Sequence, residues 1–229
     1  MKQYPNLKAV LFDFGGTLDA DGIAWKEQFF PLYQKEGFTW SPEEYAKYFY
    51  ASDDYLTEKT LTALSYSKTI HLQVGLLLKA AQVFDKKLAS KIAKAYLKGT
   101  LANLKKNIPL LRNLKKKYKL GVISNFYGNL PAIFREIGYD KIFDTVIDSN
   151  RVGHTKPDRQ IFEAALKKLK VKPEECLLVG DSYKRDMLGA KAMGIDHILV
   201  ISAEAKAWQT CCSEDRTIQS VRDLKGILL

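Results

Sequence analysis

The stretch Lys8-Ala-Val-Leu-Phe-Asp-Phe-Gly-Gly-Thr17 decides how the rest of the chain is interpreted. Its apolar part, 8–12, is short and contains valine, which predicts a buried strand, and Gly15 and Gly16 predict a tight loop after it. Asp13 therefore stands where a strand ends. Open parallel sheets bind ligands beyond the carboxyl ends of their strands, so Asp13 is a candidate site residue.

Strand and helix patterns alternate along the C-terminal half of the chain. The predicted strands are 120–124, 145–147, 176–179 and 197–201, and the helices between them are 130–137, 157–169 and about 184–193. This spacing is typical of βαβ units. The predicted fold class is therefore α/β, with a doubly wound (Rossmann-like) parallel sheet and helices on both of its faces.

Residues 23–104 have a different texture, with long helical patterns and many aromatic side chains. Ser41 and Pro42 predict a helix start, with serine as the N-cap and proline at the first helical position. A further helix is predicted over 107–118. Because the block is too long for a loop, we expect a second, all-helical cap subdomain over 20–104. The core would then comprise 1–19 and 105–229.

The composition fits an ordinary globular protein. The 229 residues are 46% hydrophobic and 27% charged, which argues against disorder, and no apolar run reaches the roughly 20 residues of a membrane helix. No signal-peptide pattern is visible, so we expect a cytoplasmic protein without a membrane partner. Of three cysteines, Cys176 is predicted to be a buried thiol, and Cys211 and Cys212 reduced bystanders.

The net charge is +10, which attracts anions in general. The lysines are scattered over predicted helices, as expected for solvated helix faces, and no nucleic-acid-binding motif accompanies them. We therefore expect no nucleic-acid partner, and the charge serves solubility or the attraction of small anions.

Polar side chains follow each of the other predicted strands. Ser124 and Asn125 end the second strand, Lys156 follows the third, and Asp181 follows the fourth, with Asp186 shortly after it. The intervals of 32 and 25 residues each correspond to about one βα unit, so these positions converge on one crevice. Clustered carboxylates imply a hard divalent cation such as Mg²⁺.

A divalent cation, a lysine and a hydroxyl group form a natural site for a phosphoryl group. The cation and the lysine neutralise charge on the phosphoryl oxygens, and loop N–H groups help to hold them. A carboxylate in such a site can act as the nucleophile and form an aspartyl-phosphate.

In these features the sequence resembles the haloacid dehalogenase superfamily, in the subgroup with a helical cap inserted after the first motif. The first motif, Asp-x-Asp-x-Thr, falls on 13–17, and the second, a serine or threonine ending a strand, falls on Ser124. The third, a lysine often before proline, falls on Lys156, and the fourth on 180–182 with Asp186. The four motifs occur in order, and the resemblance covers nearly the whole chain.

The resemblance implies roles for individual residues. Asp13 would be the nucleophile and a Mg²⁺ ligand, together with the backbone carbonyl of Gly15, with Asp181, and with Asp186 directly or through water. The catalytic set would be Asp13, Ser124 and Lys156. The phosphate would be held by Ser124, Asn125, Lys156, Gly16 and Thr17. The cap would close over the site and select the substrate.

One position departs from the family pattern. The second aspartate of the first motif, which is the family's general acid and base, is Gly15 here. A positioned acid/base usually contributes roughly 10²–10⁴-fold to the rate. The carbonyl of Gly15 can still serve a metal, but the residue cannot move protons. Asp19 and Asp21 lie a few residues further on, where the family's flap leads into the cap. Either could reach the site, but the favoured interpretation of each is an exposed turn residue.

Three hypotheses follow from Gly15. The first is a phosphatase that borrows a proton carrier or uses good leaving groups. The second is altered chemistry, either dehalogenase-like or phosphonatase-like; the latter resembles phosphonoacetaldehyde hydrolase, which has alanine at this position and a cap lysine that forms a Schiff base. The cap offers the lysines Lys47, Lys59 and Lys68, which are expected to be surface residues. The third is a catalytically weak protein that binds a phosphorylated ligand.

The sequence favours the first hypothesis: a Mg²⁺-dependent phosphatase acting on a small phosphorylated molecule through Asp13. His154 lies near Lys156 in the sequence but receives no catalytic role. The protein is expected to be a monomer or homodimer. The sequence identifies neither the substrate nor the group that compensates for Gly15.

Overall fold

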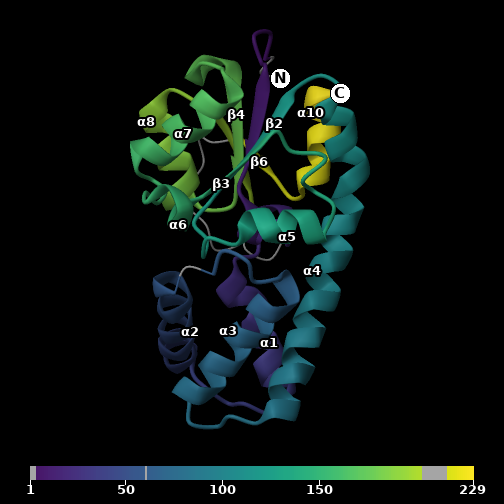
Figure 1. Cartoon of the computed structure of the whole chain (residues 1–229). Coiled ribbons are helices and arrows are strands. Elements are labelled where there is room, and N and C mark those ends of the chain that lie inside the picture. The colour runs from purple at the N-terminus through teal and green to yellow at the C-terminus, as the bar shows by residue number, and fades with distance from the viewer. Residues whose placement is uncertain (1–3, 60, 203–215) are drawn as a thin grey trace.

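The computed structural model describes residues 4–59, 61–202 and 216–229. Cys211 and Cys212 lie outside these ranges, so their predicted state is not addressed by the structure. The molecule has an upper part built around a parallel sheet and a lower part made of helices, with the marked N- and C-termini in the upper part (Figure 1).

The sheet has six strands in the order β3-β2-β1-β4-β5-β6, and all neighbouring pairs are parallel. The strands are β1 (Ala9–Phe12), β2 (Lys119–Ser124), β3 (Thr145–Asp148), β4 (Cys176–Gly180), β5 (Asp196–Val200) and β6 (Thr217–Ile218). The predicted α/β fold class is confirmed. The two-residue strand β6 was not predicted, because it is too short to carry a periodic pattern.

Helices cover both faces of the sheet, as expected for a doubly wound fold. One face packs against α7 (Arg159–Leu169) and α8 (Leu188–Met193), and Cys176 is buried there as predicted. The opposite face packs against α5 (Leu130–Glu136), α10 (Lys225–Leu228) and the C-terminal part of α4 (Lys86–Lys115). In Figure 1, α7 and α8 lie on one side of the strands, and α10 and α4 lie on the other. A short helix, α6 (Ser149–Val152), follows β3.

The lower part of the molecule is entirely helical in the residues described. It contains α1 (Trp25–Lys35), α2 (Pro42–Glu58), α3 (Tyr66–Ala80) and the N-terminal part of α4. Helix α2 begins as predicted, because the Ser41 hydroxyl accepts a hydrogen bond from the N–H of Glu44 and the Glu44 carboxylate caps Ser41 in return. These helices, called the cap below, are inserted between β1 and β2.

The helix predicted over 107–118 is not a separate element. It is the C-terminal part of α4, which runs unbroken for 30 residues and extends from the cap to the sheet. Pro109 lies inside it without ending it. The buried positions Leu104, Asn107, Leu111 and Leu114 are three or four residues apart and therefore lie on one face of the helix. This largely apolar face is buried on both sides of Pro109. The expected boundary between 104 and 105 falls within this helix.

Cap and core share one hydrophobic cluster, which runs from the sheet face that carries α5 into the cap. Aromatic rings make the junction: Phe14, which follows β1, contacts Tyr66 of α3 and Phe126 of the core, with ring centroids 6.0 and 5.7 Å apart. Trp25 also contacts Phe126, at 5.4 Å. The cap is therefore packed on the core on this side.

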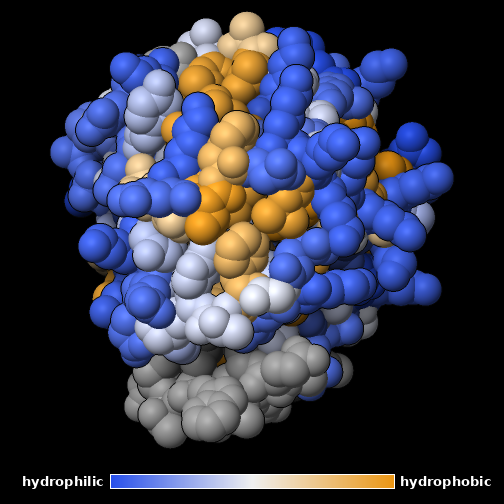
Figure 2. Space-filling view, turned by 90° about the horizontal axis from the view of Figure 1, so that it is seen from below, coloured by the Kyte–Doolittle hydropathy of each residue, from blue (hydrophilic) through white to orange (hydrophobic). Residues whose placement is uncertain are grey.

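The far end of the cap carries exposed apolar side chains. Seen from that end, apolar atoms form a stripe between polar ones (Figure 2). Val83 and Phe84, in the connection between α3 and α4, are 42% and 49% exposed. Among the residues described, no helix is both long and apolar enough to cross a membrane.

Candidate active site

The strand ends bring four of the predicted site residues to one cavity. Asp13 after β1, Ser124 at the end of β2, Lys156 after α6 and Asp181 after β4 all line a cavity of about 630 Å³ between sheet and cap. Because the strands are parallel and in register, Phe12 pairs with both Val122 and Val179, so their carboxyl ends lie at one edge.

Lys156 is the cation of the site. Its Nζ lies 2.9 Å from Asp13 Oδ1 and 2.6 Å from Asp186 Oδ1, and its side chain is almost completely buried. Burial alone would lower the pKa of Lys156, but the two carboxylates outweigh it and hold this pKa above its ordinary value. Lys156 is therefore charged at neutral pH.

Asp13, Asp181 and Asp186 form a carboxylate cluster. One oxygen from each lies within 4.8 Å of the others. Enclosure by the protein, together with the charges of Asp13 and Asp186, raises the pKa of Asp181 well above its ordinary value. Burial likewise raises the pKa of Asp186 to about 6, although Lys156 opposes the shift. The single lysine leaves the cluster with excess negative charge, which a hard divalent cation would neutralise.

Asp186 is held more firmly than the other two acids. Its Oδ1 accepts from Lys156, and its Oδ2 accepts from the N–H of Ser182 at 3.0 Å. Both oxygens are thus engaged by the protein. This geometry favours a contact of Asp186 with a metal through water over a direct one.

The loop after Asp13 is shaped by Gly16 and Thr17. Gly16 has a φ of +88°, and a Cβ built on it would lie 2.3 Å from Oδ2 of Asp181, so only glycine fits there. Its N–H donates to Oδ1 of Asp19 at 2.6 Å, and the Thr17 hydroxyl donates to Asp181 at 2.9 Å. The Gly16 N–H and the Thr17 hydroxyl, both from residues predicted to bind phosphate, therefore form hydrogen bonds within the protein. These bonds fix the loop and Asp181.

Asn125 positions the segment that carries Lys156. Its Nδ2 donates to the carbonyl of Lys156 at 3.1 Å, and its Oδ1 accepts from the N–H of Lys156 at 2.7 Å. The side-chain amide predicted to contact phosphate is thus paired with the backbone, while Asn125 still lines the cavity. Ser124 also faces this cavity.

Asp148, the last residue of β3, and Ser149, the first of α6, hold the loop after Asn125, and sequence reasoning did not identify them. Asp148 accepts hydrogen bonds from the N–H groups of Gly128 and Leu130, and the Ser149 hydroxyl accepts from the N–H of Phe126. Asp148 ends a strand, which was the available signal, but its oxygens are turned to the backbone rather than to the cavity.

The surroundings of Gly15 correct one expectation. Asp19 is not an exposed turn residue: it is 1% exposed, and its Oδ2 accepts from Nε1 of Trp25 at 2.6 Å. Burial raises its pKa to about 7, against the hydrogen bonds that lower it. Asp19 is buried through tertiary structure, because the cap covers the turn on which it lies. Asp21, which is partly exposed, pairs with Arg222 at 2.6 Å.

The cap and the loop after β4 complete the cavity wall. The cap contributes Trp25, Lys26, Glu27, Phe49, Tyr50, Asp53 and Thr57, and the loop contributes Lys184 and Arg185. Lys47, Lys59 and Lys68 are exposed and do not line this cavity, and neither does exposed His154.

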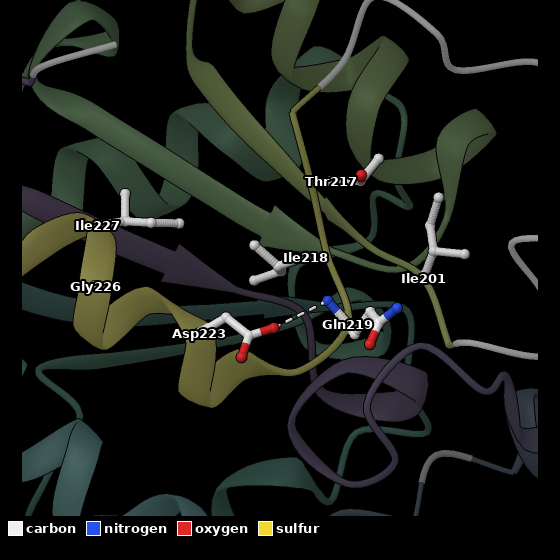
Figure 3. A pocket seen from close by; sticks show the side chains of 7 residues that line it. All are labelled: Ile201, Thr217, Ile218, Gln219, Asp223, Gly226 and Ile227. Atoms are coloured by element: carbon white, nitrogen blue, oxygen red, sulfur yellow. Dashed lines mark hydrogen bonds between the residues drawn. The ribbon is translucent and has the colours of Figure 1, made fainter. Parts of the chain in front are cut away.

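A second, smaller cavity lies at the far edge of the sheet. It has a volume of about 410 Å³ and is lined by Ile201, by β6 and the turn after it, and by Gly226 and Ile227 of α10. Figure 3 shows its one carboxylate, Asp223, bonded to the N–H of Gln219 at 3.0 Å. This cavity gathers no cluster of charged side chains, so the carboxylate site is the better candidate for catalysis.

Comparison with known proteins identifies the family. A family model described as haloacid dehalogenase-like hydrolase matches residues 7–194, which include all of the strand-end residues above. The glyceraldehyde 3-phosphate phosphatase of Methanothermobacter thermautotrophicus is 30% identical over an alignment 239 positions long, which covers 97% of this chain and all of that protein.

Other relatives match over shorter stretches. The Rhythmically expressed gene 2 protein of Drosophila melanogaster is 43% identical over 102 residues, covering 41% of this chain and 39% of that protein. The alignment thus spans well under half the length of this relative.

The crystal structure of a phosphatase from Thermococcus onnurineus matches with a TM-score of 0.57 over 97% of this chain and 98% of that one, at 24% identity. At this identity the likeness concerns the fold.

Proposed function

The chain belongs to the haloacid dehalogenase-like hydrolases, and within this enzyme family we propose that it is a Mg²⁺-dependent phosphatase acting on a small phosphorylated molecule. The observation that carries the proposal is the contact between the buried ammonium of Lys156 and Asp13, within a cluster of three carboxylates. The similarity to a glyceraldehyde 3-phosphate phosphatase supports the same reaction class.

The proposed reaction has two displacements at phosphorus. A carboxylate oxygen of Asp13 attacks the phosphorus atom, the P–O bond to the substrate breaks, and the leaving oxygen keeps the electron pair. Water then attacks the phosphorus of the aspartyl-phosphate. The bond to Asp13 breaks, which releases inorganic phosphate and restores the carboxylate, and the proton lost by water passes to phosphate or solvent. Lys156 stabilises negative charge next to Asp13 in both steps.

Mg²⁺ fits the oxygen donors of the site. Asp13 and Asp181 would hold the ion with the carbonyl of Gly15, and Asp186 would contact it through water. When bound, the ion supplies charge neutralisation and Lewis acidity at the phosphoryl oxygens. Thr17 supports this arrangement, because its hydroxyl orients Asp181.

The alternative chemistries find less support in the cavity. A phosphonatase-like reaction requires a cap lysine at the site, and Lys47, Lys59 and Lys68 are all exposed outside it. Among the described cap lysines Lys26 does line the cavity, but its ammonium is engaged by the cap itself, 3.7 Å from Oε1 of Glu27 and 5.5 Å from the ring centroid of Tyr50. A dehalogenase-like reaction needs no metal, whereas this site retains three carboxylates in one cluster.

The cavity wall supports a small anionic substrate. Lys26, Lys184 and Arg185 provide positive charge, and Tyr50 and Phe49 provide apolar surface. Such a wall suits a phosphorylated metabolite of moderate size, and it agrees with the excess of basic residues in the chain. A cytoplasmic location and a monomeric or homodimeric state complete the proposal.

The test is the release of p-nitrophenol from p-nitrophenyl phosphate, with and without Mg²⁺. We expect turnover that requires Mg²⁺ and that is lost in Asp13→Asn, which also controls for contaminating phosphatases. Turnover that persists in Asp13→Asn, or its absence from the wild type, would contradict the proposed function.

A further inference from the structure

Gly15 has ordinary backbone geometry, with φ −73° and ψ 121°. Any residue can adopt this conformation, so the backbone does not require glycine here. The constraint comes from the cap: a Cβ on Gly15 would lie 3.0 Å from Nε1 and 3.3 Å from Cδ1 of Trp25, so the indole would have to give way by a few tenths of an ångström. The space next to Gly15 is thus already filled by an indole ring.

Trp25 is fixed in this place from several directions. Its N–H donates to Asp19, and the same carboxylate accepts from the N–H of Gly16, so one acid ties the indole to the loop after Asp13. Its ring also packs edge-on against Tyr96 and Phe126, with centroids 5.9 and 5.4 Å away. The polar atom of the indole is satisfied, and its carbon surface belongs to the cavity wall.

The position of Trp25 determines what a leaving group meets. Ser124, Lys156 and Asp181 surround Asp13 from the core side of the cavity, so a phosphoryl group at Asp13 must extend its remainder toward the cap. Gly15 and Trp25 line this same cavity beside Asp13. An indole can donate a hydrogen bond but cannot transfer a proton at neutral pH, and its N–H is already engaged by Asp19.

We infer that Gly15 and Trp25 together determine specificity: position 15 carries no acid, and Trp25 fills the space in which one would stand, so the enzyme acts on phosphate compounds whose leaving group departs without being protonated. Aryl, enol and acyl phosphates belong to this class. Esters of simple alcohols, glyceraldehyde 3-phosphate among them, do not, so this chain is expected to share the reaction class of the Methanothermobacter relative but not its substrate. In the first displacement the leaving oxygen departs as the anion, and it takes its proton from solvent after the bond has broken. The inference rests on the proposed phosphatase function.

The test compares kcat/KM for aryl phosphates and for alkyl phosphates such as glycerol phosphate in the wild type, Gly15→Asp, Trp25→Ala and the double variant. We expect the wild type to favour p-nitrophenyl phosphate over the alkyl ester by at least about 100-fold, the order of what a positioned acid contributes. Gly15→Asp alone should gain nothing, because the indole occupies its space. The double variant should exceed Trp25→Ala by about 100-fold on the alkyl ester and by far less on the aryl ester.

Equal kcat/KM for both classes in the wild type would overturn the inference while leaving the phosphatase intact, because another acid such as Asp53 or Glu27 would then supply the proton. An increase of about 100-fold in kcat/KM for the alkyl ester in Gly15→Asp alone would also overturn the inference. No turnover of any phosphate by the wild type would instead refute the proposed function.

The contact itself has a test that needs no activity. Gly15→Ala should lower the melting temperature by about 2–4 °C or more in the wild type, because the added methyl group overpacks against the indole. In the Trp25→Ala background the same change should lower it much less. Gly99→Ala is the matched control, since a Cβ there meets nothing within 4 Å and should not lower the melting temperature. Equal losses in both backgrounds would show that Trp25 does not fill this space.

Discussion

The ammonium of Lys156 lies 2.9 Å from Oδ1 of Asp13, and both side chains are buried at the carboxyl edge of the sheet. The remaining hydrogen bond of Asp13 Oδ1 comes from the N–H of Phe14, at 2.6 Å. The two contacts fix one oxygen of the carboxylate. The other oxygen has no such contact with Lys156 or Phe14, which is the arrangement a nucleophilic carboxylate requires.

Replacing Lys156 should weaken the fold as well as the reaction. In Lys156→Met, Asp13 and Asp186 lose their buried counter-charge, and we expect the free energy of unfolding to fall by about 3–5 kcal/mol, measured by urea denaturation without Mg²⁺. Lys168→Met, an exposed lysine on α7, should change it by less than about 0.5 kcal/mol. Equal effects of the two substitutions would mean that the buried pair has no special role.

Mg²⁺ should stabilise the folded protein through the carboxylate cluster. A ligand present at 100 times its dissociation constant adds about 2.7 kcal/mol to the free energy of unfolding. For a protein of this size, this corresponds to a rise of several degrees in melting temperature. We expect this shift in the wild type and its loss in Asp181→Asn. Glu163→Gln, an exposed acid on α7, should keep the shift in full. A shift that survives in Asp181→Asn would place the ion elsewhere.

Asp19 should make the stability depend on pH. Burial holds its pKa at about 7 in the folded protein, above the roughly 3.9 of an unfolded aspartate, so the folded state binds this proton more tightly. The contribution of Asp19 to the free energy of unfolding is therefore complete below about pH 4 and is lost as the pH rises through about 7.

This pH dependence can be measured as the free energy of unfolding of the wild type minus that of Asp19→Asn. The difference should fall by more than about 1 kcal/mol between pH 5 and pH 8, since the asparagine side chain of the variant does not titrate. A difference that is constant or rises over this interval would contradict the assignment.

The strand-end residues could be predicted because their placement follows from topology. Once 8–12, 120–124 and 176–179 are recognised as parallel strands, the residues after them must lie at one edge of the sheet, so Asp13, Ser124 and Asp181 require no tertiary information. Lys156 was placed by spacing and by the family resemblance. The same logic predicted helices on both faces of the sheet.

The neighbourhood of Gly15 could not be predicted in the same way. Asp19 is polar and follows a glycine-rich loop, which locally indicates an exposed turn, and only the packing of the cap buries it. Trp25 looks like one of many cap aromatics in the sequence, and its position next to Gly15 depends on how α1 is oriented against the core. The continuity of α4 across residues 104–107 was missed for a related reason, because the buried face that joins its cap part to its core part becomes evident only in the packing.

The central claim is that Asp13 carries the phosphoryl group during turnover. The most direct test is to quench the enzyme with acid while it hydrolyses p-nitrophenyl phosphate in the presence of Mg²⁺, and to measure the mass of the peptide that contains residue 13. We predict a fraction of this peptide heavier by one phosphoryl group in the wild type, and none in Asp13→Asn. Turnover without a phosphorylated peptide under rapid quenching, or a phosphoryl group found on a different residue, would contradict the account.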